Sequence, residues 1–212
     1  MIARLSATST TSQPITTSVP VISKFPPSSS VPTSIPKSSS IRLTDLPTPT
    51  SVPTGLHGPF EAPHLIVPID KADPSKVVGN GYTALLSPTV STVFVYDVRP
   101  EFQGRVCNLV FFMPPALPFG EFSPAKNRAP GGILVSRLRS RVASPHISAD
   151  SVGGSTPVGT VPSIQPDNQY VVSSMPCEGG QRVAYQIDST GGLAMDFFQM
   201  TLPPLGLFMI PV

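Results

Sequence analysis

From about residue 58 onward, short apolar runs alternate with clusters of Gly, Pro, Asn and Asp. The runs have the length of β-strands, and several place apolar side chains at every second position, which is the spacing of one strand face. No window carries a sustained helical period that is free of Gly and Pro. We therefore predict about eight strands, over residues 65–69, 90–98, 106–113, 133–142, 170–174, 182–188, 192–199 and 205–210.

The strand predicted over residues 106–113 is apolar on both faces. Val110 and Phe112 share one face, whereas Leu109 and Phe111 share the other. An antiparallel strand with one face in water alternates between apolar and polar residues, and this one does not. We expect it to be buried on both sides.

The turns favour an all-β fold. Glycine pairs separate several predicted strands, where a positive φ is needed and glycine supplies it at low cost. Residues 178–181, Glu-Gly-Gly-Gln, stand directly before the apolar run at 182–188 and predict a β-hairpin. About eight strands over residues 58–212 predict a single β-sandwich or jelly-roll-like domain.

The first 57 residues have a different composition from the rest. Of residues 1–54, 32 are Ser, Thr or Pro, and all 16 glycines lie at or after Gly55. Such a segment buries too little apolar surface to offset its conformational entropy. We predict that residues 1–57 form a disordered, partly polyproline-II arm, whose Ser/Thr/Pro density also fits an O-glycosylated stalk.

Composition excludes several classes of protein. With 28 prolines in 212 residues, the chain cannot form a helical bundle or a doubly wound α/β enzyme. Charged residues make up 12% and the net charge is only +2, which argues against nucleic-acid binding. No run approaches 18 apolar residues, so we expect no membrane span, and we find no export signal at the N-terminus.

Cys107 and Cys177 are the only cysteines, and each lies in or beside an apolar run. One interpretation is a disulfide that joins two sheets, as in other sandwiches. The other is a pair of buried thiols that pack as small hydrophobes. A disulfide implies an oxidising compartment, whereas free thiols are compatible with the cytoplasm.

The candidates for metal binding are weak, so we expect no metal or cofactor site. His57, His64 and His146 are scattered, without ligand spacing. Asp70 and Asp73 flank a turn and raise the question of a calcium site. Asp at these positions more commonly caps the turn backbone through its side chain.

The candidates for catalysis are equally weak, and we predict a protein without enzymatic activity. There is no G-x-S-x-G motif, and Cys107 lies in an apolar context that disfavours a reactive thiolate. Two carboxylate pairs, Asp97 with Glu101 and Asp188 with Asp196, keep a carbohydrate-active protein open as a third alternative.

Two surface features stand out. One is an apolar run at 111–119, whose second half we interpret as a loop over the end of the sandwich or as a partner-binding loop. The other is a group of bases without intervening acids, which we interpret as a solvated sheet face or as an anion-binding patch. This basic group consists of Lys126, Arg128, Arg137, Arg139 and Arg141.

Three segments, in this order, resemble the C-terminal domain of the fungal But-two (ubiquitin-three-binding protein) family. They are Pro63-His64-Leu65-Ile66, the strand Gly104-Arg105-Val106-Cys107-Asn108-Leu109-Val110-Phe111-Phe112-Met113-Pro114, and the closing Gly206-Leu207-Phe208. Each motif is weak alone, but together they span residues 58–212. Residues 115–163 carry few recognisable family positions.

The resemblance implies a fungal β-sandwich with a bridge between Cys107 and Cys177, and it brings no catalytic residues. Most relatives look secreted or wall-associated, which implies an extracellular or cell-wall module that binds a protein or a wall polysaccharide. The alternative is a cytoplasmic adaptor that binds the activating enzyme of a ubiquitin-like modifier, in the neddylation pathway. The ligand-binding residues stay unknown at this point.

Overall fold

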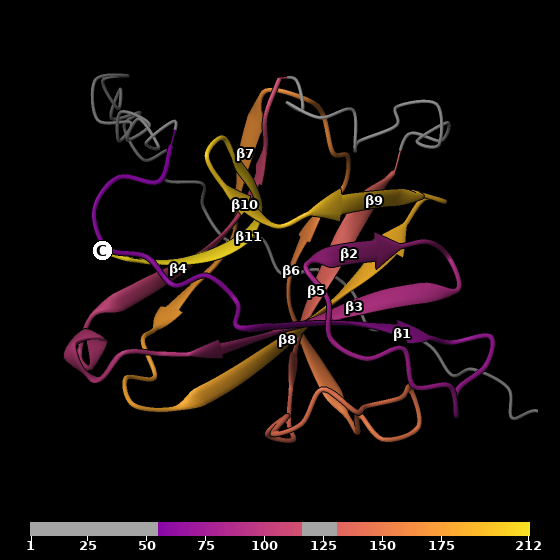
Figure 1. Cartoon of the computed structure of the whole chain (residues 1–212). Helices are drawn as coiled ribbons and strands as arrows, with labels where there is room; N and C mark the ends of the chain where they lie inside the picture. The colour runs from indigo at the N-terminus through magenta and orange to yellow at the C-terminus, as the bar shows by residue number, and fades with distance from the viewer. Residues whose placement is uncertain (1–54, 116–130) are drawn as a thin grey trace, which may run out of the picture. The chain divides into compact units, whose positions relative to one another are not determined.

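The computed structural model describes residues 55–115 and 131–212, and these residues form an all-β fold (Figure 1). The arm predicted for residues 1–57 lies outside the described residues, apart from residues 55–57. One 3-10 turn, η1 (Pro100–Phe102), accompanies the strands of the described part. The strands are β1 (Leu65–Asp70), β2 (Thr83–Leu86), β3 (Val90–Asp97), β4 (Val106–Met113), β5 (Gly132–Leu138), β6 (Ser155–Val161), β7 (Asn168–Pro176), β8 (Arg182–Thr190), β9 (Met195–Phe198), β10 (Met200–Thr201) and β11 (Pro204–Pro211).

The strands form three antiparallel sheets. A five-stranded sheet has the order β1-β3-β8-β5-β6, and a four-stranded sheet has the order β10-β11-β4-β7. The two remaining strands, β2 and β9, pair as a ribbon. This arrangement confirms the predicted all-β sandwich.

The main core lies between the two larger sheets. It contains Phe94 and Tyr96 from β3 and Phe111 from β4, all fully buried. The Phe197 ring of β9 lies 6.4 Å from the Phe94 ring and 5.6 Å from the Phe111 ring, between centroids. Burying a Phe side chain contributes roughly 1.5–3 kcal/mol, so this aromatic group fixes the β2–β9 ribbon to both sheets.

Strand β4 is buried on both faces, as its sequence predicts. Its inner face carries Leu109 and Phe111, and its outer face carries Val110 and Phe112. The Phe112 ring packs edge-on against Phe208 of β11, with centroids 5.8 Å apart. Residues 56–60 cover this outer cluster, because Leu56 and Phe60 pack against it.

A second apolar cluster explains why β3 is also apolar on both faces. Val142, Ile147 and Val152 come from the segment after β5 and are buried against Val93 and Val95. The outer face of the five-stranded sheet is therefore a small core of its own.

Two side chains connect the β2–β9 ribbon to its neighbours, because each donates one hydrogen bond to a backbone carbonyl and accepts one from a backbone amide. The Thr92 hydroxyl of β3 donates to the Leu85 carbonyl (2.7 Å) and accepts from the Leu85 amide (2.9 Å). On the other side, the Gln199 amide group makes the same pair of bonds with the Leu207 backbone, at 3.1 Å each. Buried backbone groups at the ribbon edges are satisfied in this way.

The structure corrects several of the sequence predictions. Strands β2, β6 and β10 were not predicted, and the strand predicted over 133–142 ends at Leu138. The hairpin predicted at residues 178–181 is wrong. The turn exists, with Gly180 at φ +74°, but it connects β7, which pairs with β4, to β8, which pairs with β3 and β5. The turn therefore crosses between the sheets.

Candidate binding groove

The disulfide links Cys107 to Cys177, and both side chains are buried. It does not join the two sheets, contrary to one interpretation of the sequence. Cys107 lies on β4, and Cys177 directly follows β7, the hydrogen-bonded neighbour of β4. The Cys177 amide continues that pairing, since it donates to the Arg105 carbonyl at 2.9 Å. The bond therefore fixes the end of β7 at the point where the chain leaves for the other sheet.

The first candidate carboxylate pair is divided between separate ion pairs. Asp97 accepts two hydrogen bonds from Arg182, at 2.7 and 3.1 Å, and lies 3.3 Å from His64 Nδ1. The hydrogen-bonded Arg182 guanidinium lowers the pKa of Asp97, while burial lowers the pKa of His64. Glu101 lies on η1, 3.7 Å from Arg99.

The second pair is split between two sheets. Asp188 lies on β8 of the five-stranded sheet and accepts from Lys71 (2.9 Å), from the Ser91 hydroxyl and from Gln186 (2.9 Å). Asp196 lies on β9, opposite Leu85. The contacts of Asp97 and Asp188 are those of carboxylates that hold strands together.

The remaining metal candidates have structural roles. Asp70 accepts from the amides of Ala72 and Asp73 and from Lys76 Nζ, which is the backbone capping expected of an Asp in a turn. His146 contacts Ser144. Within residues 55–115 and 131–212, no three His, Cys, Asp or Glu side chains gather as a metal-binding group.

The basic group predicted from the sequence is divided in space. Arg137 makes two 2.9 Å hydrogen bonds to Glu178, an acid 41 residues further on. Arg141 donates to Gln181 at 2.7 Å, and Arg139 lies beside Gly154. Lys126 and Arg128 lie outside the described residues.

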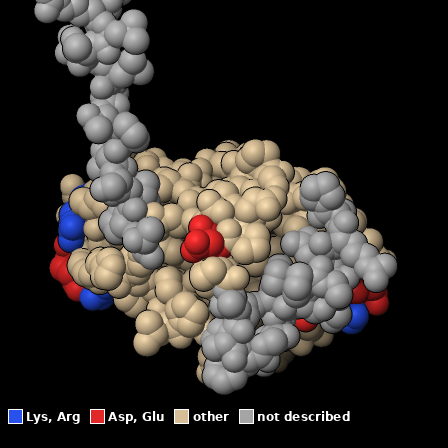
Figure 2. All heavy atoms as spheres, turned by 90° about the horizontal axis from the view of Figure 1, so that it is seen from above, with Lys and Arg blue, Asp and Glu red and all other residues tan. Residues whose placement is uncertain are grey.

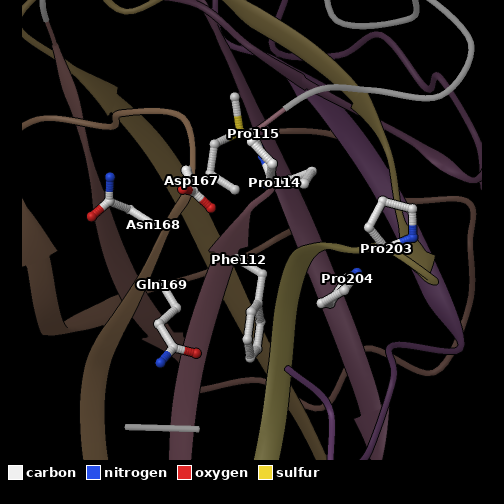
Figure 3. A pocket seen from close by; sticks show the side chains of 9 residues that line it. Phe112, Pro114, Pro115, Asp167, Asn168, Gln169, Pro203 and Pro204 are labelled. Atoms are coloured by element: carbon white, nitrogen blue, oxygen red, sulfur yellow. The ribbon is translucent and has the colours of Figure 1, made fainter. Parts of the chain in front are cut away.

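A groove opens where the apolar run leaves β4. It has a volume of about 480 Å³ and is lined by three segments of the described chain, residues 112–115, 167–169 and 203–204 (Figure 3). These are the end of β4, the start of β7 and the turn between β10 and β11. The rest of the predicted apolar loop, residues 116–119, lies outside the described residues.

Phe112 forms the floor of the groove. In the sheet it lies between Gln169 on β7 and Gly206 on β11. Glycine is favoured there, because φ is +104° and a Cβ at position 206 would lie 2.0 Å from the side-chain oxygen Oε1 of Gln199. The aromatic packing against Phe208 holds the Phe112 ring in place.

The walls of the groove are rigid and mostly apolar. In Figure 3, Pro203 and Pro204 line one side, Asp167 and Asn168 the other, and Pro114 with Pro115 the far end. A proline ring fixes its own φ, so such walls lose little entropy when a ligand binds. The Asn168 side chain donates to the Pro166 carbonyl at 2.8 Å and fixes the turn that presents Asp167.

The surface near the groove carries little charge. Figure 2 shows that the described part of the upper face is almost free of Lys, Arg, Asp and Glu, with a small acidic area near its middle. Leu202, next to the groove residue Pro203, is 87% exposed. A second apolar patch lies on the β2–β9 ribbon, where the rings of Tyr82 and Phe198 are 5.7 Å apart.

Only one wall of the groove follows from the sequence. Pro114 and Pro115 belong to the predicted apolar loop, but residues 167–169 and 203–204 were not predicted as site residues. The available signal was the clustering of turn-forming residues at Pro166-Asp167-Asn168 and at Pro203-Pro204. The pairing of β4 with β7 and β11, which brings them together, is not readable from either segment.

Comparison with known proteins identifies one family. The sequence model described as "Ubiquitin 3 binding protein But2 C-terminal domain" matches residues 61–203, a span that includes every groove residue except Pro204. No curated protein matches the chain. In the described residues, no helix is long and apolar enough to cross a bilayer.

Proposed function

We propose that this chain, a member of the But2 C-terminal domain family, is a non-enzymatic protein-binding module whose groove receives a segment of its partner. The groove is the observation that carries the proposal. Its volume of about 480 Å³ and its Phe and Pro lining suit a few side chains of a bound polypeptide. The family description, which names a binding protein, supports the same function.

The proposed place of action is an oxidising compartment, outside or at the surface of a fungal cell. The buried Cys107–Cys177 disulfide supports this, because such bonds persist in secreted proteins and are rare in the cytosol. Mass spectrometry of the protein from its native host, without reduction, tests the compartment. Two free thiols there would contradict it.

A second candidate is an intracellular adaptor for a ubiquitin-like protein or its activating enzyme. The family description supports it, since it names binding to ubiquitin 3. Titration of the full chain with purified ubiquitin-like proteins and their activating enzyme, in reducing buffer, tests this candidate. Absence of binding at micromolar concentrations would eliminate it.

The groove itself is tested by filling it. Asn168 is exposed and lies on the groove wall at the start of β7, so Asn168→Trp places a large ring at the groove without disturbing the core. It also removes the hydrogen bond from Asn168 to the Pro166 carbonyl. Asn168→Ala removes the same bond without adding a ring and should keep peptide binding, so it separates the two effects. Ser155→Trp is the matched control, because Ser155 is also exposed at the start of a strand, β6, and does not line the groove.

The probe is a random heptapeptide library displayed on phage, selected on the full chain and counter-selected on Asn168→Trp. We expect peptides that bind the natural chain and Ser155→Trp and lose binding to Asn168→Trp. If no peptide distinguishes the natural chain from Asn168→Trp, the groove is not a peptide-binding site.

A further inference from the structure

Asp167 is the only ionisable side chain among the described residues that line the groove. Its carboxylate is exposed and makes no ion pair or hydrogen bond with another residue of the described chain. Asp97 and Asp188, by contrast, are each held by a base. Among the described residues, the Asp167 carboxylate is therefore a negative charge on the groove wall without a basic partner.

The backbone at Asp167 adds a second observation. Asp167 has φ +57° and is the only non-glycine residue of the described chain with a positive φ. Asp and Asn adopt this left-handed conformation more readily than other non-glycine residues. The turn thus fixes the backbone from which the Asp167 side chain extends along the groove wall (Figure 3).

The surroundings of this carboxylate define the complementary group. Pro115 and Pro204 offer accessible aliphatic ring surface, and the nearly buried Phe112 closes the floor. A Lys or Arg side chain has an apolar stem with a cationic head, so it can pack its methylenes against these rings while its head reaches Asp167. A neighbouring apolar residue of the same segment would occupy the floor.

We infer that the groove selects an extended peptide segment in which a Lys or Arg lies beside an apolar residue, with Asp167 pairing with the base. This inference rests on the proposed function and deepens it by naming the chemistry of the partner. The charge and the apolar walls together exclude acidic segments, because these would place like charge beside Asp167 without a compensating base.

The test uses the sequences of the groove-dependent peptides and one isosteric substitution. Asp167→Asn removes the charge but keeps a residue type that tolerates a positive φ, so the turn is retained. Asp150→Asn removes an equal charge at an exposed position of the segment after β5 and serves as the control. Affinities of acetylated synthetic peptides are measured by fluorescence polarisation at low and high salt.

We expect a basic residue next to an apolar one in the enriched peptides. Asp167→Asn should weaken binding roughly threefold to tenfold, and added salt should weaken it in the natural chain but much less in this variant. Asp150→Asn should bind as the natural chain does. Peptides that need the open groove but lack a base, or that bind Asp167→Asn equally well, would overturn this inference and leave the proposed function intact. Failure to recover any groove-dependent peptide would overturn both.

Discussion

The disulfide gives the most quantitative prediction for stability. Cys107 and Cys177 are separated by 70 residues, so their bond shortens a long loop in the unfolded chain. In the chain-entropy treatment, a loop of this length stabilises the folded state by about 4 kcal/mol. For a domain of this size, the loss should lower Tm by about 8–16 °C.

Two perturbations measure this contribution separately. The double substitution Cys107→Ala and Cys177→Ala removes both the bond and the sulfur atoms, whereas reduction of the natural protein removes only the bond. The Cys177 amide still donates to the Arg105 carbonyl at 2.9 Å, so the pairing of β4 with β7 should remain. We therefore expect a native far-ultraviolet spectrum for both forms, with lowered stability.

Circular dichroism during thermal and urea unfolding, with and without reductant, is the assay. Both forms should unfold at lower temperature, with the double variant slightly less stable because its sulfur atoms no longer fill the core. A Tm shift below about 2 °C on reduction would refute the entropic reasoning, since it corresponds to less than about 1 kcal/mol.

Three further predictions concern the fold. The free energy of unfolding should fall as the pH rises from about 10 through 12, because burial raises the pKa of Tyr185 to about 12 and that of Tyr96 well above its usual value, and both must ionise on unfolding; the part of the 295 nm absorbance change that Tyr185→Phe removes should coincide with the change in circular dichroism. Gly159→Ala should cost roughly 1–3 kcal/mol in urea unfolding, because a Cβ there would lie 2.0 Å from a carbonyl oxygen of β7. Thr92→Val should cost roughly 1–3 kcal/mol per unpaired group by the same assay, since it leaves the Leu85 amide and carbonyl without partners.

Each of these has a control in the same chain. Gly81→Ala introduces the same methyl group where the nearest atom is 3.8 Å away, so it should be close to neutral. Thr83→Val is the same Thr-to-Val change at an exposed position of β2, and it should change the free energy of unfolding by less than about 0.5 kcal/mol. Equal losses at test and control positions would contradict the assigned contacts. Ionisation of Tyr96 and Tyr185 near pH 10 while the protein stays folded would contradict the burial of these two side chains.

The sequence predicts the strong strands of this fold and misses the weak ones. Strand β4 is readable because both of its faces are apolar, and strands β3 and β11 carry similar apolar runs. Strand β6 contains Pro157 and Gly159, residues that normally interrupt strands, so its pattern does not predict its structure. Local patterns specify where strands lie, whereas their pairing depends on contacts between distant segments.

The same limit applies to the groove. The apolar residues that follow β4 suggest a loop for binding, but Asp167 carries no sequence signal beyond that of a turn. Its position across the groove from Pro204 follows from the order β11-β4-β7, which residues 167–169 cannot reveal alone. The turn at residues 178–181 illustrates the converse, because its sequence indicates a turn but not which sheets it connects.

The central claim, that the groove is the protein-binding surface, is tested most directly by nuclear magnetic resonance. The full chain, labelled with nitrogen-15, is titrated with a peptide enriched from the library. We predict that the amide shifts of Met113, Asp167, Asn168 and Gln169 change in a saturable manner, because these residues line the groove and have amide protons. Saturable changes confined to the β2–β9 ribbon, around Tyr82 and Phe198, would contradict the claim and place binding on that second patch.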